Sequence, residues 1–169
     1  QIQVNNKVDL TFASALRSIL RQDPDIIMIG EIRDQETASI AVQASITGHL
    51  VVSTMHTNNA VGTLNRIADM GIARYLIADA IIGVVAQRLV RKLCPHCRTK
   101  RLATDKEKRI LRRSEAEQTE IYEPGGCKLC NNTGYFGRTG VFEIMEVNDD
   151  MRRLIAENAS TEEMIAAAK

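Results

Sequence analysis

The sequence predicts an α/β fold in which parallel strands alternate with helices. Two short apolar segments, residues 26–29 and 50–52, are separated by a helical pattern, and further helical patterns precede and follow them. Strand, helix, strand and helix in this order imply right-handed crossovers and a parallel sheet. Further along, all four cysteines fall into two Cys-x-x-Cys pairs, which indicates a separate small module.

The first helix is predicted over residues 9–22, where apolar side chains recur at helical spacing. Asp23 precedes a proline and therefore avoids the helical conformation, so the helix ends there. The apolar run 26–29 shows no polar alternation, which is typical of a strand that is buried on both faces. The run 50–52 is interpreted in the same way.

Between the two strands, Asp34 can cap a helix that reaches about residue 47, and Gly48 can end it. Another helix is predicted over residues 59–70, followed by Gly71. A long helix is expected over residues 74–93, with a buried apolar first half and a basic end.

The composition changes after residue 93, and we expect three parts. Residues 1–93 form the α/β part, residues 94–135 contain the cysteine pairs, and residues 136–169 contain a short strand, 141–147, and two small helices. The 29 residues between the cysteine pairs leave room for a helical hairpin.

The composition is that of an ordinary globular protein. The 169 residues are 44% hydrophobic and 25% charged, with a net charge of +1. No segment reaches the roughly 18 apolar residues of a membrane span, and the N-terminus lacks a basic-then-apolar secretory pattern. Because the chain opens abruptly on the polar segment 1–5, we expect it to be part of a longer protein.

Polar side chains follow both predicted strands. Gly30 and Glu31 come after the first, and Thr54, His56, Thr57 and Asn58 come after the second. Parallel strands place such residues at the carboxyl edge of a sheet, where α/β folds bind ligands. A carboxylate there can polarise an attacking water or support magnesium, but it is also compatible with an ordinary solvated glutamate. Likewise, one histidine after a strand is more often structural, whereas two strands that deliver polar groups to one edge favour a site.

Three long segments resemble the bacterial secretion and pilus-assembly motor ATPases, most closely the type II secretion ATPases. They are Leu20-Arg-Gln-Asp-Pro-Asp-Ile-Ile-Met-Ile-Gly-Glu-Ile-Arg-Asp34, Thr47-Gly-His-Leu-Val-Val-Ser-Thr-Met-His-Thr57 and Ala86-Gln-Arg-Leu-Val-Arg91. The tetracysteine region and Gly137-Arg-Thr-Gly140 match as well, so the resemblance covers nearly the whole chain.

The resemblance implies a RecA-like domain with an inserted zinc module. Glu31 then corresponds to the Walker B glutamate, and His49 and His56 to the histidine-box residues, with His56 favoured as the sensor of the γ-phosphate. Gly30 and Thr54 would join His49 in binding the nucleotide. The cofactors would be ATP with magnesium and structural zinc.

The same resemblance predicts a ring-shaped homohexamer on the cytoplasmic face of the inner membrane. It would drive assembly of a pilus-like fibre, and hence protein export across the outer membrane, through inner-membrane partners. The chain contains no Gly-x-x-x-x-Gly-Lys-Ser/Thr loop, whose backbone amides and lysine hold phosphates. The family's loop, acidic box and arginine fingers all lie upstream, so we expect this chain alone to be inactive.

The cysteine pairs Cys94/Cys97 and Cys127/Cys130 supply the four thiolates of a tetrahedral zinc site. Two disulfides or a redox Cys-x-x-Cys are the alternatives, but an ATPase works in the reducing cytosol, which disfavours disulfides. His96 is interpreted as a bystander because four cysteines already close the site.

Residues 98–113 carry eight basic side chains against two acidic ones. They are interpreted as a solvated face that the acidic residues of 115–123 partly neutralise. The alternative is a contact with anionic lipid headgroups or an acidic protein. Nucleic acid is not expected, because no aromatic residue is interleaved for base stacking.

Two alternatives to the secretion motor remain at this point. The first is a type IV pilus extension motor, whose motifs overlap with those quoted above. The second is a zinc-ribbon binding module without catalysis, which accounts for residues 94–130 but leaves residues 20–58 unexplained.

Overall fold

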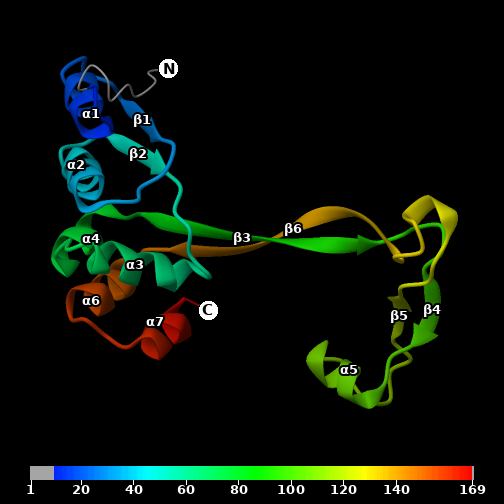
Figure 1. Ribbon diagram of the computed structural model, residues 1–169. Coiled ribbons are helices and arrows are strands. Elements are labelled where there is room, and N and C mark those ends of the chain that lie inside the picture. The colour runs from blue at the N-terminus through cyan, green and yellow to red at the C-terminus, as the bar shows by residue number, and fades with distance from the viewer. Residues whose placement is uncertain (1–9, 169) are drawn as a thin grey trace. The chain divides into compact units, whose positions relative to one another are not determined.

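The computed structural model describes residues 10–168 and divides them into two compact units (Figure 1). Residues up to 86 together with those from 142 onward form the first unit, and residues 87–141 form the second. The polar opening 1–5 and the first residue of the predicted helix 9–22 lie outside the described residues.

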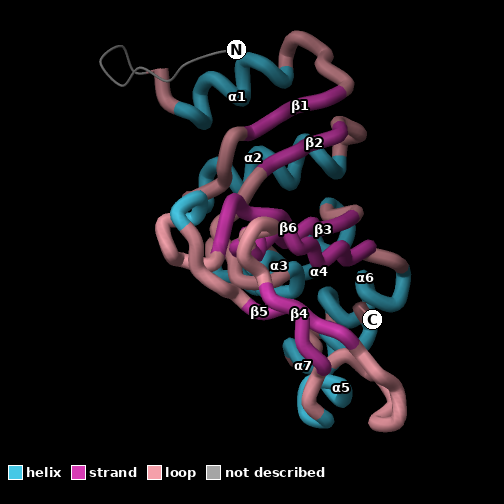
Figure 2. The backbone as a smooth tube through the Cα atoms, turned by 90° about the vertical axis from the view of Figure 1, so that its right-hand side faces the viewer, coloured by secondary structure: helices cyan, strands magenta, loops and turns pink. Residues whose placement is uncertain are grey.

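The first unit begins with the predicted alternation of helices and strands. Its elements are α1 (Phe12–Leu20), β1 (Ile26–Ile29), α2 (Gln35–Ile46) and β2 (Leu50–Ser53). The two strands run parallel and side by side, with Ile26 opposite Leu50 and Ile29 opposite Ser53 (Figure 2). Asp34 caps α2 as expected, because its Oδ1 accepts a 2.8 Å hydrogen bond from the Thr37 amide.

One face of this strand pair is covered by α1 and α2. Ile27 and Ile29 point into a core with apolar side chains from both helices. Ile26 and Met28 point the other way and are 63% and 68% exposed. In β2, Leu50 and Val52 are likewise 44% and 46% exposed. The expectation that both strands are buried on both faces is therefore wrong for the described part of the chain, because both helices pack on the same side.

After β2 the chain forms α3 (Ala60–Asp69) and α4 (Arg74–Ala80). The long helix expected over 74–93 is wrong: α4 ends at Ala80, and the chain continues as β3 (Gly83–Leu93). The physical reason lies in the residues 81–85, where a glycine interrupts a run of isoleucine and valine. Glycine destabilises helix interiors, and β-branched side chains favour strands.

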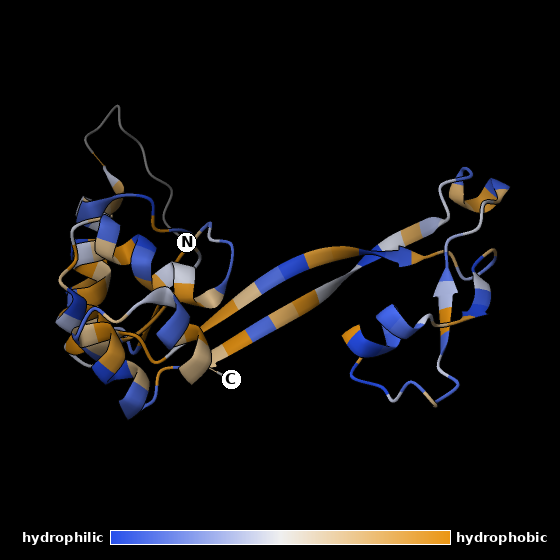
Figure 3. Ribbon diagram, turned by 90° about the horizontal axis from the view of Figure 1, so that it is seen from below, coloured by the Kyte–Doolittle hydropathy of each residue, from blue (hydrophilic) through white to orange (hydrophobic). Residues whose placement is uncertain are grey.

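Strand β3 pairs with β6 (Tyr135–Glu146), so the short strand predicted over 141–147 is the end of a longer one. Short bands of hydrophobic and hydrophilic residues follow one another along both strands (Figure 3). The chain then closes with α6 (Asp149–Ala156) and α7 (Thr161–Ala167), the two predicted terminal helices. Their buried side chains Met151, Ile155 and Met164 share a core with α3 and α4.

The second unit contains the cysteine pairs and a β-hairpin. Strands β4 (Thr99–Leu102) and β5 (Glu120–Glu123) pair antiparallel, and α5 (Asp105–Ile110) lies between them in the sequence. A 3-10 turn, Lys128–Cys130, lies in the second cysteine pair. The helical hairpin expected between the pairs is therefore wrong, since α5 is the one α-helix in residues 98–126. Thr104 and Glu107 cap that helix reciprocally, which ends the preceding strand and starts the helix.

Within residues 10–168, no helix combines the length and the apolar character needed to cross a membrane.

Candidate functional site

The carboxyl ends of β1 and β2 are tied together by two hydrogen bonds. The Thr54 hydroxyl donates to the Gly30 carbonyl oxygen at 2.6 Å, and the Ile32 amide donates to the Thr54 carbonyl oxygen at 3.1 Å. These bonds extend the parallel pairing beyond the strands. Gly30, Glu31 and Thr54 consequently lie at one edge of the strand pair, as the sequence predicts.

Glu31 lies between two nitrogen-bearing side chains at this edge. Its Oε2 atom is 2.5 Å from Arg33 Nε and 3.5 Å from His56 Nε2. The His56 contact is an ion pair only when the imidazole is protonated. The Glu31 side chain is 36% exposed and that of His56 is 89% exposed, so both groups can reach a ligand from solvent. Exposed pairs of this kind contribute only about 0–1 kcal/mol to stability, and exchanging them for a ligand is inexpensive.

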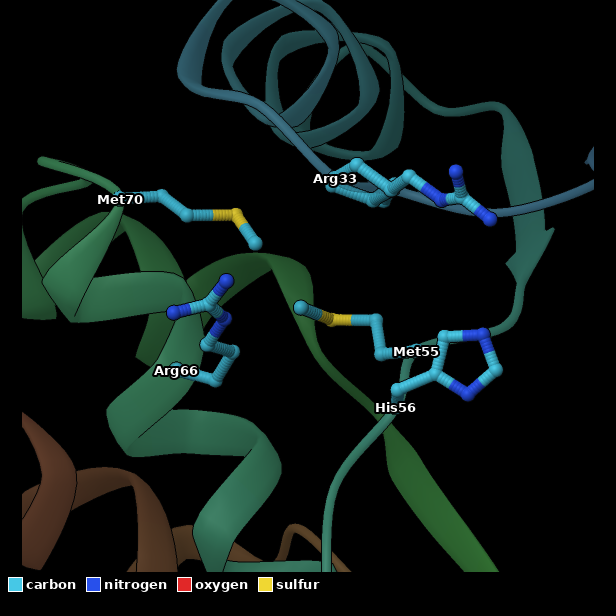
Figure 4. A pocket seen from close by; sticks show the side chains of 6 residues that line it. Arg33, Met55, His56, Arg66 and Met70 are labelled. Carbon is cyan, nitrogen blue, oxygen red and sulfur yellow. The ribbon is translucent and has the colours of Figure 1, made fainter.

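A pocket of about 330 Å³ lies beside these residues. Its lining combines the nitrogen-bearing residues Arg33, His56 and Arg66 with the apolar residues Ile32, Met55 and Met70. Figure 4 shows Arg33 and His56 directed toward the same side, with Met55 pointing toward Arg66. The arrangement offers cationic groups next to one carboxylate, which suits an anionic ligand.

His49 lies at the other end of β2. Its Nδ1 is 3.0 Å from the Ala44 carbonyl oxygen and 3.3 Å from the Thr47 hydroxyl, both at the end of α2. The five residue steps from His49 to Thr54 span about 16 Å in extended conformation. The structure therefore does not bring His49 together with Glu31 and His56, and its role in nucleotide binding stays a prediction.

The four cysteines of the second unit converge on one point. The sulfur atoms all lie within 4.8 Å of one another, and three pairs are 3.7–3.9 Å apart. Four sulfurs around a tetrahedral zinc, each at about 2.3 Å, would be about 3.8 Å apart. All four thiols are free, and a disulfide would need about 2.05 Å between sulfurs. The donor set and its spacing therefore fit one metal ion.

The protein surroundings favour a thiolate at this cluster. Burial opposes ionisation of Cys130, but the amides of Cys127 and Gly134 donate to its sulfur, and the net effect lowers its pKa to about 6. Burial, followed by hydrogen bonds with the other three thiols, raises the pKa of Cys97 to about 12. The amides that point at the Cys130 sulfur favour its thiolate form, which is the form that a metal ligand requires.

Two glycines let the backbone close around the cluster. A Cβ atom on Gly125 would lie 2.0 Å from the Cys97 carbonyl oxygen. Gly134 has a φ of +75°, and its Cβ would lie 2.6 Å from the Gly125 oxygen. Any other residue at these positions would push the cysteine segments apart.

Most of the basic side chains of residues 98–113 are paired within the second unit. Arg101 bonds Glu107 at 2.7 Å and Glu123 at 2.8 Å, joining the hairpin to α5. Four more also pair: Lys100 with Glu120, Lys108 with Asp105, Arg109 with Glu115 and Arg113 with Glu117. The Arg98 guanidinium lies 4.5 Å from the centre of the Tyr122 ring. These contacts agree with the interpretation of the stretch as a largely neutralised, solvated face.

Sequence reasoning missed Arg33 and Arg66. Arg33 had a local signal, because residues two apart in an extended segment share a face, and Arg33 follows Glu31 at that spacing. Arg66 had none, since it reaches the pocket from α3 only through the packing of that helix.

Comparison with known proteins connects this site with a family. The sequence model of the family described as Type II/IV secretion system protein matches residues 1–169. Type II secretion system protein E of Aeromonas hydrophila is 54% identical over 155 residues, covering 92% of this chain and 31% of the relative. Type II secretion system ATPase E of Vibrio cholerae is 52% identical over 164 residues, covering 97% of this chain and 33% of the relative.

Among solved structures, the crystal structure of the pilus retraction motor PilT with bound ADP is similar, with a TM-score of 0.63 and 29% sequence identity. The match covers 93% of this chain and 35% of that one. The chain thus spans about a third of the length of the curated relatives it matches. With a family match over its whole length, the chain belongs to the Type II/IV secretion system protein family.

Proposed function

We propose that the chain is a portion of a secretion motor ATPase that couples ATP hydrolysis to assembly of a pilus-like fibre and to protein export across the outer membrane. The observation that carries this proposal is the meeting of Glu31 and His56, 3.5 Å apart, at the carboxyl edge of a parallel strand pair. That edge is where α/β folds bind ligands and where motor ATPases place a carboxylate. A RecA-like sheet, of which β1 and β2 are two strands, belongs to the same proposal.

In this proposal Glu31 orients or deprotonates the water that attacks the γ-phosphate, a role worth about 10²–10⁴ in rate. His56 contacts the γ-phosphate, and protonation would suit it to that anion. Gly30 lets the nucleotide approach the backbone, because it has no side chain and the space beside it is open: no atom lies within 4 Å of the place that a Cβ would take. Thr54 holds the two strand ends together, and His49 contributes to nucleotide binding from the other end of β2. ATP would bind with magnesium.

Cys94, Cys97, Cys127 and Cys130 would hold one zinc ion with a structural role. Four thiolates leave no coordination position for water, so such a site does not activate a nucleophile. Zinc would instead supply folding free energy to the second unit. The sulfur spacing of 3.7–3.9 Å supports this assignment.

The intact protein would assemble as a homohexamer in the cytoplasm, on the inner membrane, and would act on inner-membrane proteins of the secretion system. A lipid contact through residues 98–113 is the weaker part of this proposal, because five of their eight basic side chains already pair with carboxylates. No nucleic-acid partner is proposed.

The similarity values support a secretion motor rather than a pilus motor within the family. Type II secretion proteins reach 55% identity, whereas the pilus retraction motor PilT is 29% identical. A zinc-ribbon module without catalysis has less support, because the family match extends over residues 1–169 and includes both strand ends.

The test is steady-state phosphate release from the intact protein that contains this chain, compared with the variant Glu31→Gln. The parent should hydrolyse ATP and support export in cells, and Glu31→Gln should do neither. Glu36→Gln is the matched control, because Glu36 is an exposed carboxylate that bonds only Arg17 in the described structure. A parent without ATPase activity would refute the proposed function. The 169-residue chain alone should release no phosphate, since it lacks the phosphate-binding loop sequence.

A further inference from the structure

We propose that Glu143 is a positioning residue that fixes His56 for its contact with the nucleotide. Glu143 lies on β6, far from the site in sequence, and its carboxylate Oε2 accepts a 3.1 Å hydrogen bond from the Ala60 amide. Ala60 is the first residue of α3, four residues after His56. The inference rests on the proposed ATPase function and adds a residue that acts through His56.

The loop from Thr54 to Asn59 is fixed to neighbouring elements on both sides of His56. Its first end is fixed to β1 by the bonds between Thr54, Gly30 and Ile32. Its second end is the start of α3, where Asn59 Oδ1 accepts a 2.7 Å bond from the Gly62 amide. His56 lies between these ends with an 89% exposed side chain. Its position is therefore set by the two anchors rather than by packing of the imidazole.

The anchor at α3 depends on a group from outside the loop. The first amides of a helix have no partner within the helix. The Asn59 side chain satisfies the Gly62 amide, but the Ala60 amide bonds Glu143. A negative carboxylate is well suited here, because the helix N-terminus carries partial positive charge and α3 has no acidic residue in its first turn. Glu143 thus supplies the charge that the loop and helix lack.

The start of α3 is closely linked to the loop that carries His56. Ala60, Val61 and Leu64 are 0%, 1% and 0% exposed, so the beginning of α3 is packed against the core. Three residues separate Ala60 from His56, and the Thr57 hydroxyl is tied to Thr63 of the same helix at 2.9 Å. A misplacement of about 1 Å at a reacting group can cost about 10²-fold in rate.

A purely structural role makes a different prediction. If Glu143 only stabilised α3, its removal would lower the stability of the fold and leave the nucleotide preference of the folded enzyme unchanged. If it positions His56, its removal would weaken the contact with the γ-phosphate specifically. ADP lacks that phosphate and serves as the internal reference.

The experiment uses the intact protein and four variants: Glu143→Ala, Glu143→Gln, His56→Ala and the double variant Glu143→Ala/His56→Ala. Affinities for ADP and for a non-hydrolysable ATP analogue are measured alongside kcat. Glu143→Ala should lower kcat at least about tenfold and the analogue-over-ADP preference at least about fivefold, with ADP affinity within about twofold. Glu143→Gln should keep both kcat and the analogue-over-ADP preference within about threefold of the parent, because the amide oxygen of glutamine can still accept the hydrogen bond from the Ala60 amide.

The double variant should show the same preference as His56→Ala alone, since the two residues act as a unit. Glu146→Ala is the control, because Glu146 is an exposed carboxylate on the same strand. If Glu143→Ala does not fold, Glu143→Asp, whose carboxylate is one methylene shorter, is compared in its place. A preference within about twofold of the parent, or effects of the two single changes that simply multiply in the double variant, would overturn the inference. If the intact parent protein shows no ATPase activity at all, the proposed function is refuted instead.

Discussion

Replacing Cys127 with serine removes one sulfur from a cluster in which the Cys127 Sγ lies 3.9 Å from Cys94 and 3.7 Å from Cys130. Zinc held by four such thiolates contributes about 10–16 kcal/mol in small modules. The second unit has few other contacts that could replace the stabilisation by zinc. Among its described residues, the buried apolar side chains are those of Ala103 and of two of the cysteines, Cys94 and Cys130.

The expected result is loss of structure confined to the second unit. Ordering a residue costs about 1–2 kcal/mol of backbone entropy, whereas burial of one methylene group contributes only about 0.8 kcal/mol. We therefore expect Cys127→Ser, or prolonged chelation, to unfold residues 94–135. The first unit has its own cores, which include Leu64, Ile77 and Ile155 at 0% exposure, and should stay folded.

Hydrogen exchange followed by mass spectrometry separates the two units. The amides of residues 94–135 should lose protection without zinc, and those of α2, α3 and α6 should keep it. His96→Ser is the matched control, since His96 lies inside the first knuckle, is exposed, and is not among the four ligand positions. Equal protection of residues 94–135 with and without metal would refute the reasoning, because the hairpin would then be stable through its own contacts.

Two further predictions concern stability. Arg101 first, and then the backbone and hydroxyl of Thr104, hold the pKa of Glu107 below its ordinary value of 4.5. The ionised Glu107 side chain therefore stabilises the fold above pH 4.5, and this stabilisation is lost as the pH falls through the lowered pKa. The amides of α5 should exchange more slowly in the parent than in a Glu107→Gln variant at neutral pH, and the difference should shrink in acid. A difference that does not change with pH would contradict this prediction. In the first unit, Ile29→Ala should cost about 2–5 kcal/mol in urea unfolding because Ile29 is 1% exposed. Ile26→Ala should cost less than about 1 kcal/mol because Ile26 is 63% exposed, and equal losses would contradict the one-sided packing of β1.

The sequence predicted correctly those features that depend on residues close together in the chain. The cap at Asp34 and the strands of the two apolar runs have causes within a few residues, and the cap and both strands formed where they were predicted. The cysteine spacing likewise predicted a four-sulfur cluster, because the two knuckles have few other ways to combine. Glu31 and His56 could be placed together since both follow strands that proved to be parallel.

The errors arose where distant segments decide the outcome. The basic, alanine- and leucine-containing residues 86–93 suit a helix, but β3 pairs with β6, about 50 residues later in the chain. Likewise, the bond between Glu143 and Ala60 joins residues 83 positions apart and has no local pattern. The one-sided burial of β1 depends on both α1 and α2 packing against the same face, which periodicity within a four-residue strand does not reveal.

The most direct test of the central claim separates nucleotide binding from hydrolysis in the intact protein carrying Glu31→Gln. Glutamine keeps the shape of the side chain but cannot accept a proton from the attacking water. The account predicts that ATP affinity stays within about threefold of the parent while kcat falls about 10²–10⁴-fold. Turnover within about threefold of the parent would show that the carboxylate between Arg33 and His56 is not the group that activates water, and would contradict the account.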